Sequence, residues 1–430
     1  MHLFLIGAGH VGLVTAAGLA RLGHRVTVAD IDADRIDGLG RGVAPVFEPG
    51  LEDALNACAA GGRLAFTTDL GPPAECAHSI VTVSTPTGPD GPLSTANVEQ
   101  VVTSLLNVTG ADHTIVVRST LPVDGPARLI ALRGDGADRA AIVTNPEFMR
   151  EGNALADFER PDRLIVGWLE ERDQAAAQNV LGLYDGVDAP TLVADARSVA
   201  LVKLATNVFL ATKVAYANEL ARICDVVGAD VDTVADGIGL DPRIGRAFLT
   251  AGPGYGGSCL PEQAIALSLI TAARNIPTPL IAAVSHSNET HQRAIVARLA
   301  TLVGGSLRGR RVAVLGLAFK ANTDDVRESP ALSLAEYVRE AGAEVVATDP
   351  RAVAKARRLD PELLTADTVA EAVTDADAVL VATEWRDYAA LDWADLARRM
   401  RGDLVYDTRD IVPAAAVTGA GLRYASLGRG

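Results

Sequence analysis

The chain has 430 residues, of which 49% are hydrophobic and only 4% aromatic, so it favours two or three domains with aliphatic cores, as in parallel α/β sheets. The formal net charge of −15 argues against nucleic acid or an anionic membrane as the main partner. No apolar run approaches the roughly 18 residues needed to span a bilayer.

The first 150 residues alternate apolar strand-like runs with helical stretches. We expect strands at residues 3–6, 25–29, 79–83, 114–117 and 141–144, and helices between them, such as 11–22 and 98–107. This alternation predicts a doubly wound parallel sheet. Tracts 71–73 and 86–92 are rich in glycine and proline and predict loops at strand ends, where ligands bind in such folds.

The opening segment, MHLFLIGAGHVG, contains the motif G-x-G-x-x-G at residues 7–12. The motif follows a predicted strand, begins a predicted helix, and is followed by a second strand that ends at Asp30, which together form the dinucleotide-binding fingerprint. Gly7 permits a tight turn, Gly9 admits a diphosphate to the backbone, and Gly12 lets helix and strand pack. Asp30 favours NAD over NADP, because its carboxylate accepts from ribose hydroxyls and repels a 2′-phosphate.

The same segment has no basic stretch before its apolar run and leads directly into the glycine turn. We therefore read it as part of the fold rather than as a signal peptide, and we expect a cytoplasmic protein.

Residues 196–228 predict one long helix, since they contain neither glycine nor proline before the last position. Lys203 and Asn207 are four residues apart and so share one face of this helix. Only four of the 39 basic residues are lysine, so a lysine here is more readily explained by ammonium chemistry. A glycine-rich loop, 250–261, follows and is too irregular to be a helix or strand.

The four cysteines have unrelated spacings, which predict neither a disulfide framework nor a zinc site, and we expect no metal. Three of them, Cys58, Cys76 and Cys224, lie in apolar or helical stretches. Cys259 instead stands just before Pro261, a residue type favoured at the first helical positions. A helix N-terminus there would help to ionise the thiol.

The α/β alternation begins again at residue 311 with RVAVLGLAF, a helix near 332–341, and the runs AEVVATDP, ADAVLVATEW and GDLVYDTRD. This second turn keeps only Gly316, so we expect it to bind a nucleotide other than NAD. The expected fold is α/β, with two Rossmann-like doubly wound domains joined by a long central helix and a helical segment. We place the domain boundaries at 1–193, 194–300 and 301–430.

Several segments, taken in order, are similar to the UDP-glucose/GDP-mannose dehydrogenase family over essentially the whole chain. They are GAGHVGLVTAAGLARLGH, STPTGPDG, RSTLPV, NPEFMREGNALADFERPDR, KLATNVFLATKVAYANELARIC, DPRIGRAFLTAGPGYGGSC, GLAFKANTDDVRESPA and TEWRDY. The sequence RIG followed by GYGGSC resembles the UDP-glucose branch most. This resemblance implies an NAD-binding first domain, a helical dimerisation domain that carries the cysteine loop, a nucleotide-sugar-binding third domain, and an active site between them.

The resemblance implies that UDP-glucose is oxidised to UDP-glucuronate by two hydride transfers to NAD. The first gives an aldehyde, which adds to the Cys259 thiol; the resulting thiohemiacetal is oxidised to a thioester, which water hydrolyses. Lys203 and Asn207 would stabilise the developing oxyanions. Thr120 and Glu147 would hold or activate the water, with Glu147 as the general base.

The resemblance also implies two sets of binding residues. Contacts to the cofactor are expected from Gly7, Gly9, His10, Val11, Gly12, Asp30, Arg35, Thr85, Thr120, Glu151 and Arg327. Contacts to the substrate are expected from Phe148, Lys203, Asn207, Arg243, Phe248, Tyr255, Gly256 and Lys320. Arg243 would reach the site of a neighbouring subunit, which implies a homodimer or a higher oligomer.

The chain departs from the family after Cys-Leu-Pro, where Glu262 and Gln263 replace the usual Lys-Asp. Lys203 would then lack its acidic partner, and Glu262 would oppose ionisation of Cys259. Ala200 and Asp410 also replace a common glutamate and a usual asparagine. These changes leave open a different nucleotide sugar, an oxidation that stops after two electrons, and a binding protein with impaired catalysis.

Overall fold

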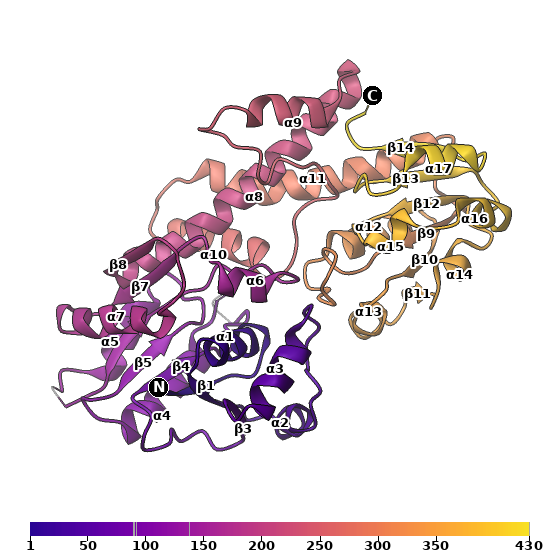
Figure 1. The fold of residues 1–430 in the computed structure, drawn as a ribbon. Coiled ribbons are helices and arrows are strands. Elements are labelled where there is room, and N and C mark those ends of the chain that lie inside the picture. Colours follow the sequence, from indigo (N-terminus) through magenta and orange to yellow (C-terminus); the bar gives the residue numbers. More distant parts are fainter. Residues whose placement is uncertain (89–90, 92, 137, 430) are drawn as a thin grey trace. The chain divides into compact units, whose positions relative to one another are not determined.

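A computed structural model describes residues 1–88, 91, 93–136 and 138–429. It divides into two compact units, 1–206 and 207–430, and its elements are labelled in Figure 1. Each unit contains one sheet with helices on its faces, which confirms the expected α/β class with two Rossmann-like domains. In the predicted loop 86–92, residues 89, 90 and 92 lie outside the described part.

The sheet of the first unit has eight strands in the order β3-β2-β1-β4-β5-β6-β7-β8. Their bounds are β1 His2–Ile6, β2 Arg25–Ala29, β3 Leu64–Thr67, β4 His78–Val81, β5 Thr114–Val117, β6 Ala141–Thr144, β7 Leu164–Trp168 and β8 Thr191–Asp195. The helices are α1 His10–Arg21, α2 Ala33–Gly40, α3 Leu51–Ala60, α4 Ala96–Val108, α5 Gly125–Arg133, α6 Ala154–Glu159 and α7 Gln174–Leu181.

Two expectations about this sheet need correction. All neighbouring strands run parallel except β6 and β7, which pair antiparallel, so the sheet is not wholly parallel. The strand expected at 79–83 ends at Val81. Beyond it, the carbonyl of Val83 accepts from the Ser119 hydroxyl at 2.6 Å rather than from a neighbouring strand.

Strand β1 shows why the sheet is covered on both faces. Its residues alternate between two separate hydrophobic clusters: Leu3 and Leu5 belong to one, and Phe4 and Ile6 to the other. All four side chains are buried. Because successive strand residues point to opposite faces, a strand that is apolar throughout requires helices on both sides of the sheet.

Helix α8 (Ala196–Val227) is the long helix expected from the sequence, and the division between the units falls within it. By length and composition alone this helix could cross a membrane, with a mean hydropathy of 1.4 over 18 residues. The expectation that no segment is long and apolar enough to span a bilayer therefore does not extend to this helix. Of that window, 44% is buried inside the protein, and the helix also carries the buried polar residues Lys203 and Asn207.

The second unit continues with three more helices and a six-stranded sheet in the order β11-β10-β9-β12-β13-β14, parallel throughout. The helices before the sheet are α9 Val231–Gly239, α10 Leu260–Ala272 and α11 Pro279–Leu302. The strands are β9 Arg311–Leu315, β10 Glu344–Thr348, β11 Leu364–Thr365, β12 Ala378–Val381, β13 Leu404–Asp407 and β14 Arg423–Ser426. The expected restart of the alternation at residue 311 is confirmed.

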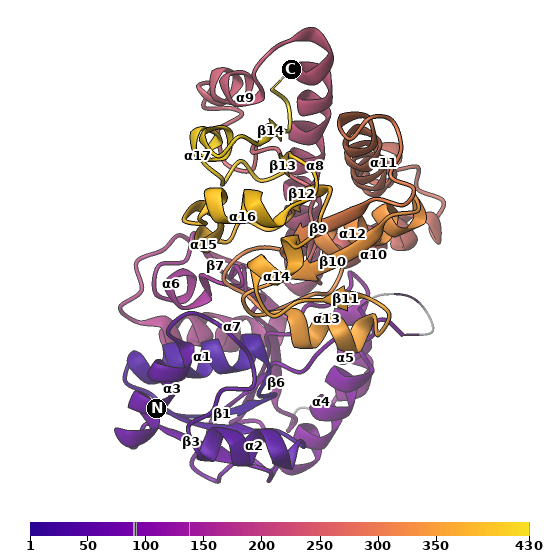
Figure 2. The same ribbon diagram turned by 90° about the vertical axis from the view of Figure 1, so that its right-hand side faces the viewer.

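Figure 2 shows this sheet with helices around it. They are α12 Pro330–Glu340, α13 Val353–Leu359, α14 Val369–Val373, α15 Arg386–Ala389, α16 Trp393–Arg399 and α17 Ala414–Gly419. One hydrophobic cluster spans the sheet and these helices, and it is mainly aliphatic, with Trp385, Tyr388, Trp393 and Tyr406 as its large aromatic members.

Candidate functional site

The turn from β1 into α1 provides an anion-binding backbone. Gly7 has a φ of +111°, and a side chain there would approach the Thr82 backbone within 2.9 Å. A Cβ on Gly12 would lie 1.9 Å from the Gly7 carbonyl oxygen, whereas a Cβ on Gly9 would meet nothing within 4 Å. Gly9 caps α1 without any side-chain hydrogen bond. The helix therefore directs unblocked N–H groups to a ligand that has room to approach over Gly9.

Asp30 stands where the fingerprint expects it, at the carboxyl end of β2. Its carboxylate accepts from the Ala8 and Asp32 N–H groups at 2.7 and 3.0 Å and from the Arg35 guanidinium at 2.9 Å. Burial alone would raise the pKa of Asp30, but these donors outweigh it and hold the pKa below 3.8. The group is therefore anionic at neutral pH, which suits a ribose diol and disfavours a 2′-phosphate. These residues fit NAD.

His10, the first residue of α1, brings in a carboxylate that the sequence did not single out. His10 Nε2 lies 2.6 Å from Oε2 of Glu48, whose side chain is almost fully buried. Glu48 also accepts from the N–H groups of Gly152 and Ala154, at 2.7 and 2.9 Å. Glu48 precedes α3, in a stretch whose sequence indicates a loop. The sequence carries no signal linking it to a residue 38 positions away.

Glu147 and Lys203 form a buried ion pair. Lys203 Nζ donates to the Glu147 carbonyl oxygen and lies 3.2 Å from its Oε1. Burial raises the pKa of Glu147, but Lys203, Arg118 and the Met149 N–H outweigh this effect and lower it. The expectation that Lys203 lacks an acidic partner is therefore wrong. Residue 263 is a glutamine, but Glu147 supplies the negative charge.

A small cavity adjoins this pair. It has a volume of about 10 Å³ and is lined by Ser119, Leu121, Thr144, Pro146, Val199, Ala200 and Lys203, which is about the space that one water occupies. The lining residues come from the loop after β5, which holds Thr120, from the end of β6 and the loop after it, which holds Glu147, and from the start of α8. The carboxyl-end loops of these two strands therefore bring the expected water-binding region next to Lys203.

Phe148 follows Glu147 and stacks with two cations. The Arg163 guanidinium lies 4.0 Å from the centre of its ring, and Lys203 Nζ lies 5.0 Å from it. Such contacts fix the position of a cation while leaving its remaining donors usable. Among the other expected cofactor residues of this unit, Val11, Thr85 and Glu151 are partly exposed.

In the second unit, Cys259 caps the N-terminus of α10 and its side chain is exposed. The N–H of Gln263 bonds to the Cys259 carbonyl oxygen, and the Gln263 side chain, 2% exposed, accepts from the Asn207 amide at 2.9 Å. The side chain of Gln263 therefore orients Asn207 by a neutral hydrogen bond. The Cys259 thiol is favourably placed for ionisation, because it lies at a helix N-terminus.

Glu262 lies in the first turn of α10 and is partly buried. Burial raises the pKa of Glu262, Arg327 lowers it, and Glu328 and Asp325 raise it further. The Glu262 carboxylate thus feels three charged side chains of the segment before α12, namely Asp325, Arg327 and Glu328. Arg327 itself is exposed and donates to Asp325 at 2.9 and 3.0 Å.

The glycine-rich loop that precedes Cys259 is held by α11. Asn288 accepts from the Tyr255 N–H and donates to its carbonyl, and His291 bonds the Gly252 carbonyl at 2.8 Å. A Cβ on Gly256 would lie 2.2 Å from the Glu328 carbonyl oxygen. The loop is therefore packed too closely to accept larger residues, and Tyr255 is buried within it.

Three other expected substrate residues are more open. Lys320 Nζ lies 5.3 Å from the centre of the Phe319 ring. Phe248 is 38% exposed and has a φ of +63°. Arg243 is bound by the neighbouring Asp241, and its side chain is 87% exposed, so within its own unit it is not drawn into a binding site.

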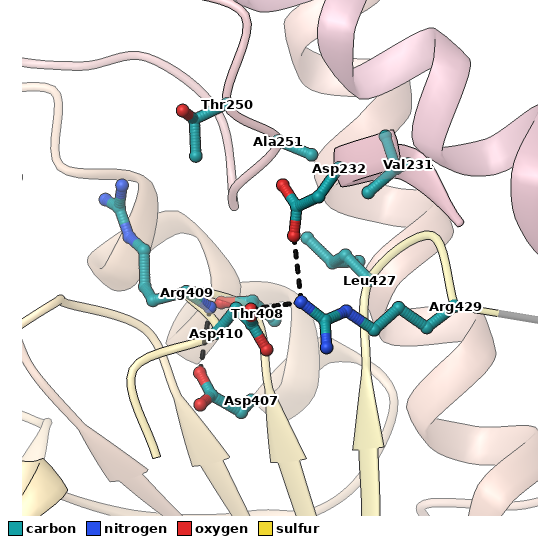
Figure 3. Close-up of a pocket in the computed structure, with 10 residues that line it drawn as sticks. All are labelled: Val231, Asp232, Thr250, Ala251, Asp407, Thr408, Arg409, Asp410, Leu427 and Arg429. Atoms are coloured by element: carbon teal, nitrogen blue, oxygen red, sulfur yellow. Dashed lines mark hydrogen bonds and ion pairs between the residues drawn. The ribbon is translucent and has the colours of Figure 1, made fainter. Parts of the chain in front are cut away.

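A larger cavity in the second unit was not anticipated. It has a volume of about 150 Å³ and is lined by Val231, Asp232, Thr250, Ala251, Asp407, Thr408, Arg409, Asp410, Leu427 and Arg429 (Figure 3). Arg429 crosses it and donates to Asp232 and to Asp410. The unusual aspartate at position 410 therefore serves an ion pair with the C-terminal segment.

Family models match three segments of the chain. Residues 1–185 match the NAD binding domain of the UDP-glucose/GDP-mannose dehydrogenase family, 197–290 its central domain, and 313–414 its UDP binding domain. The chain is 39% identical to a UDP-glucose 6-dehydrogenase of Rhizobium meliloti over the full length of both proteins.

Two solved structures are similar over nearly the whole chain. A UDP-glucose dehydrogenase from Pyrobaculum islandicum has a TM-score of 0.87 at 37% identity, covering 99% of this chain and 96% of that one. A UDP-D-ManNAc dehydrogenase from Pyrococcus horikoshii has a TM-score of 0.85 at 26% identity, covering all of both chains.

Proposed function

Because this chain belongs to the UDP-glucose/GDP-mannose dehydrogenase family, we propose that it oxidises carbon 6 of UDP-glucose twice and releases UDP-glucuronate. Its cofactor is NAD, and it is an oxidoreductase that acts on a CH–OH group of a nucleotide sugar. The choice of sugar, the two-step reaction and the covalent intermediate are the proposal.

Bound NAD supplies the hydride acceptor for both oxidations. In the first, the sugar alcohol loses a hydride to NAD and a proton to solvent and becomes an aldehyde. Lys203 and Asn207, one turn apart on α8, stabilise the negative charge that develops on the alcohol oxygen. Their donors are fixed before the reaction, since Lys203 is bound to Glu147 and Asn207 to Gln263.

In the second half of the reaction, the Cys259 thiolate adds to the aldehyde carbon, and the oxygen takes a proton to give a thiohemiacetal. Loss of a second hydride and that proton leaves a thioester. Exposure of Cys259 at the N-terminus of α10 supports this role. Glu147 then takes one proton from water, the water oxygen displaces the thiolate, and the carboxylic acid that forms gives its remaining proton to solvent and leaves as the carboxylate.

The observation that carries this assignment is the buried Glu147–Lys203 pair beside a cavity of about 10 Å³. Burying an ion pair costs free energy unless its partners are well satisfied. A chain with few lysines that buries one against a carboxylate, next to room for about one water, has the parts needed to activate that water.

The direct test incubates the purified protein with UDP-glucose and NAD and identifies the product by mass spectrometry. The proposal requires UDP-glucuronate. A Cys259→Ser variant should lose uronate formation, while Ser258→Ala, one residue away, keeps it. Full uronate formation by Cys259→Ser would refute the covalent role.

A second candidate is oxidation of another UDP-sugar, such as an N-acetylated hexosamine. Two observations favour this second function. The chain is similar to the Pyrococcus horikoshii UDP-D-ManNAc dehydrogenase, and the amide of Gln263 replaces the carboxylate usual in the family. Comparing kcat/KM for UDP-glucose and for UDP-N-acetylmannosamine decides between the two.

We further propose a cytoplasmic homodimer with the domain boundaries 1–193, 194–300 and 301–430. On α8, the side chains of Phe209, Tyr216 and Ile223 are spaced by seven residues and each is more than half exposed, so they form an apolar stripe suited to a second copy of this helix. Light scattering should give a dimer, and Phe209→Glu with Tyr216→Glu should give a monomer.

A further inference from the structure

Glu48 connects the cofactor turn to a second segment of the same unit. Its carboxylate takes three donors: the His10 imidazole at 2.6 Å and the N–H groups of Gly152 and Ala154 at 2.7 and 2.9 Å. A buried carboxylate with this many partners is fixed in position. His10 is therefore held at the first position of α1, where the free N–H groups of the helix are.

The charges around His10 come from two segments. Glu48 reaches it from the stretch before α3, and Glu147 and Glu151 lie on the segment after β6. Burial lowers the pKa of His10, but the bond to Glu48 and the charges of Glu151, Glu48 and Glu147 outweigh it, so the pKa is raised above 6.5. The surrounding carboxylates thus favour the charged form of the ring.

We propose that His10, positioned by Glu48, is a cationic ligand for the diphosphate of NAD. Nε2 is committed to Glu48, which leaves the Nδ1–H to donate to a phosphate oxygen. The side chain is 18% exposed, so it is not closed off from a ligand at the helix N-terminus. A charge-assisted bond of this kind adds to the N–H groups and the helix dipole.

The proposal predicts how cofactor affinity depends on pH. The imidazolium is present below the raised pKa of His10 and is lost as the pH rises through it, so affinity falls with increasing pH. Glu48 acts through His10. Glu48→Gln removes the negative charge that favours the imidazolium, so the fall should move to lower pH. The inference concerns NAD and does not depend on which sugar is oxidised.

The test is fluorescence titration with NADH from pH 6 to 9. We expect the wild-type dissociation constant to rise about tenfold, the worth of one charge-assisted hydrogen bond. His10→Gln should bind about tenfold more weakly at pH 6 and show no such rise. His2→Gln is the matched control, because His2 also pairs with a glutamate, Glu75 at 3.1 Å, but at the opposite end of β1. It should follow the wild type.

A wild-type rise that persists in His10→Gln would overturn the proposal. Calorimetry first establishes whether this variant folds. If it does not, the imidazole signal of His10 is followed by NMR in the wild type and in Glu48→Gln. NADH should raise the pKa of His10 in both, from a lower starting value in Glu48→Gln. A pKa unchanged by NADH would contradict the assignment as directly as the titration.

Discussion

The turns that open the two sheets are built alike, yet only the first fits a dinucleotide. Gly7 follows β1 with a φ of +111°, and Gly316 follows β9 with a φ of +107°. A threonine just after the end of the neighbouring strand supports each turn: the Thr82 hydroxyl bonds the Gly7 carbonyl, and the Thr383 hydroxyl bonds the Ala318 carbonyl.

The aspartates that follow β2 and β10 differ in how many hydrogen bonds their carboxylates accept. The Asp30 carboxylate accepts hydrogen bonds from the N–H groups of Ala8 and Asp32 and from the Arg35 guanidinium. Asp349 takes five donors: the N–H groups of Leu317, Ala318, Arg351 and Ala352 and the indole of Trp385. A carboxylate has about four lone-pair sites, so Asp349 has none left for a ribose.

The helices also start at different distances from their strands. Helix α1 begins at His10, four residues after β1 ends, whereas α12 begins at Pro330, well beyond β9, which ends at Leu315. The first turn thus directs a helix N-terminus at the ligand, and the second does not. Loop length and acceptor occupancy, rather than the shared fold, separate the two sheets.

The largest effect should follow from Gly12→Ala. Its Cβ would lie 1.9 Å from the Gly7 carbonyl oxygen, so the turn must shift, at a cost of about 1–3 kcal/mol in the free energy of unfolding. NADH affinity should fall roughly 100-fold or more, because several phosphate contacts depend on the turn. Fluorescence titration and calorimetry measure the two effects. Unchanged NADH binding would mean that this turn does not hold the cofactor.

Gly9→Ala should separate binding from stability. Its Cβ would meet nothing within 4 Å, so the melting temperature should stay close to that of the wild type. The methyl group would occupy the space over which the diphosphate approaches, and NADH affinity should fall about tenfold or more. A drop in stability without a change in affinity would contradict the assigned roles of the two glycines.

Replacing each aspartate by asparagine compares the two sheets directly. Asp30→Asn should weaken NADH binding about tenfold, the worth of a hydrogen bond to a charged group. Asp349→Asn should leave NADH affinity unchanged and lower the stability of the second unit instead, since several donors lose their acceptor. Equal effects of the two changes on NADH binding would break the distinction between the turns.

The smallest effect concerns acid stability. The pKa of Asp30 is lowered in the folded state from its ordinary value of 3.8, so its contribution to stability is fully present above that ordinary value and is lost as the pH falls through the lowered one. The gap in melting temperature between the wild type and Asp30→Asn should therefore narrow on acidification from pH 5 to pH 3. A melting-temperature gap that widens on acidification would contradict a lowered pKa of Asp30 in the folded state.

The sequence was most informative where function depends on backbone geometry. Gly7, Gly9, Gly12 and Asp30 form a local pattern, and the structure places them as that pattern requires. Contacts between distant side chains had no such signal: Glu48 to His10, Glu147 to Lys203, and Gln263 to Asn207. The two-residue strand β11 and the antiparallel β7 also escaped prediction, because short strands have little periodicity and strand direction depends on tertiary pairing.

The most direct measurement is the number of NADH molecules formed per UDP-glucose consumed. A single dinucleotide turn, used for two successive oxidations with a thioester between them, predicts two NADH and one UDP-glucuronate for each sugar. One NADH per sugar, with an aldehyde trapped by a hydroxylamine, would contradict the account and would mean that the chain stops after the first oxidation.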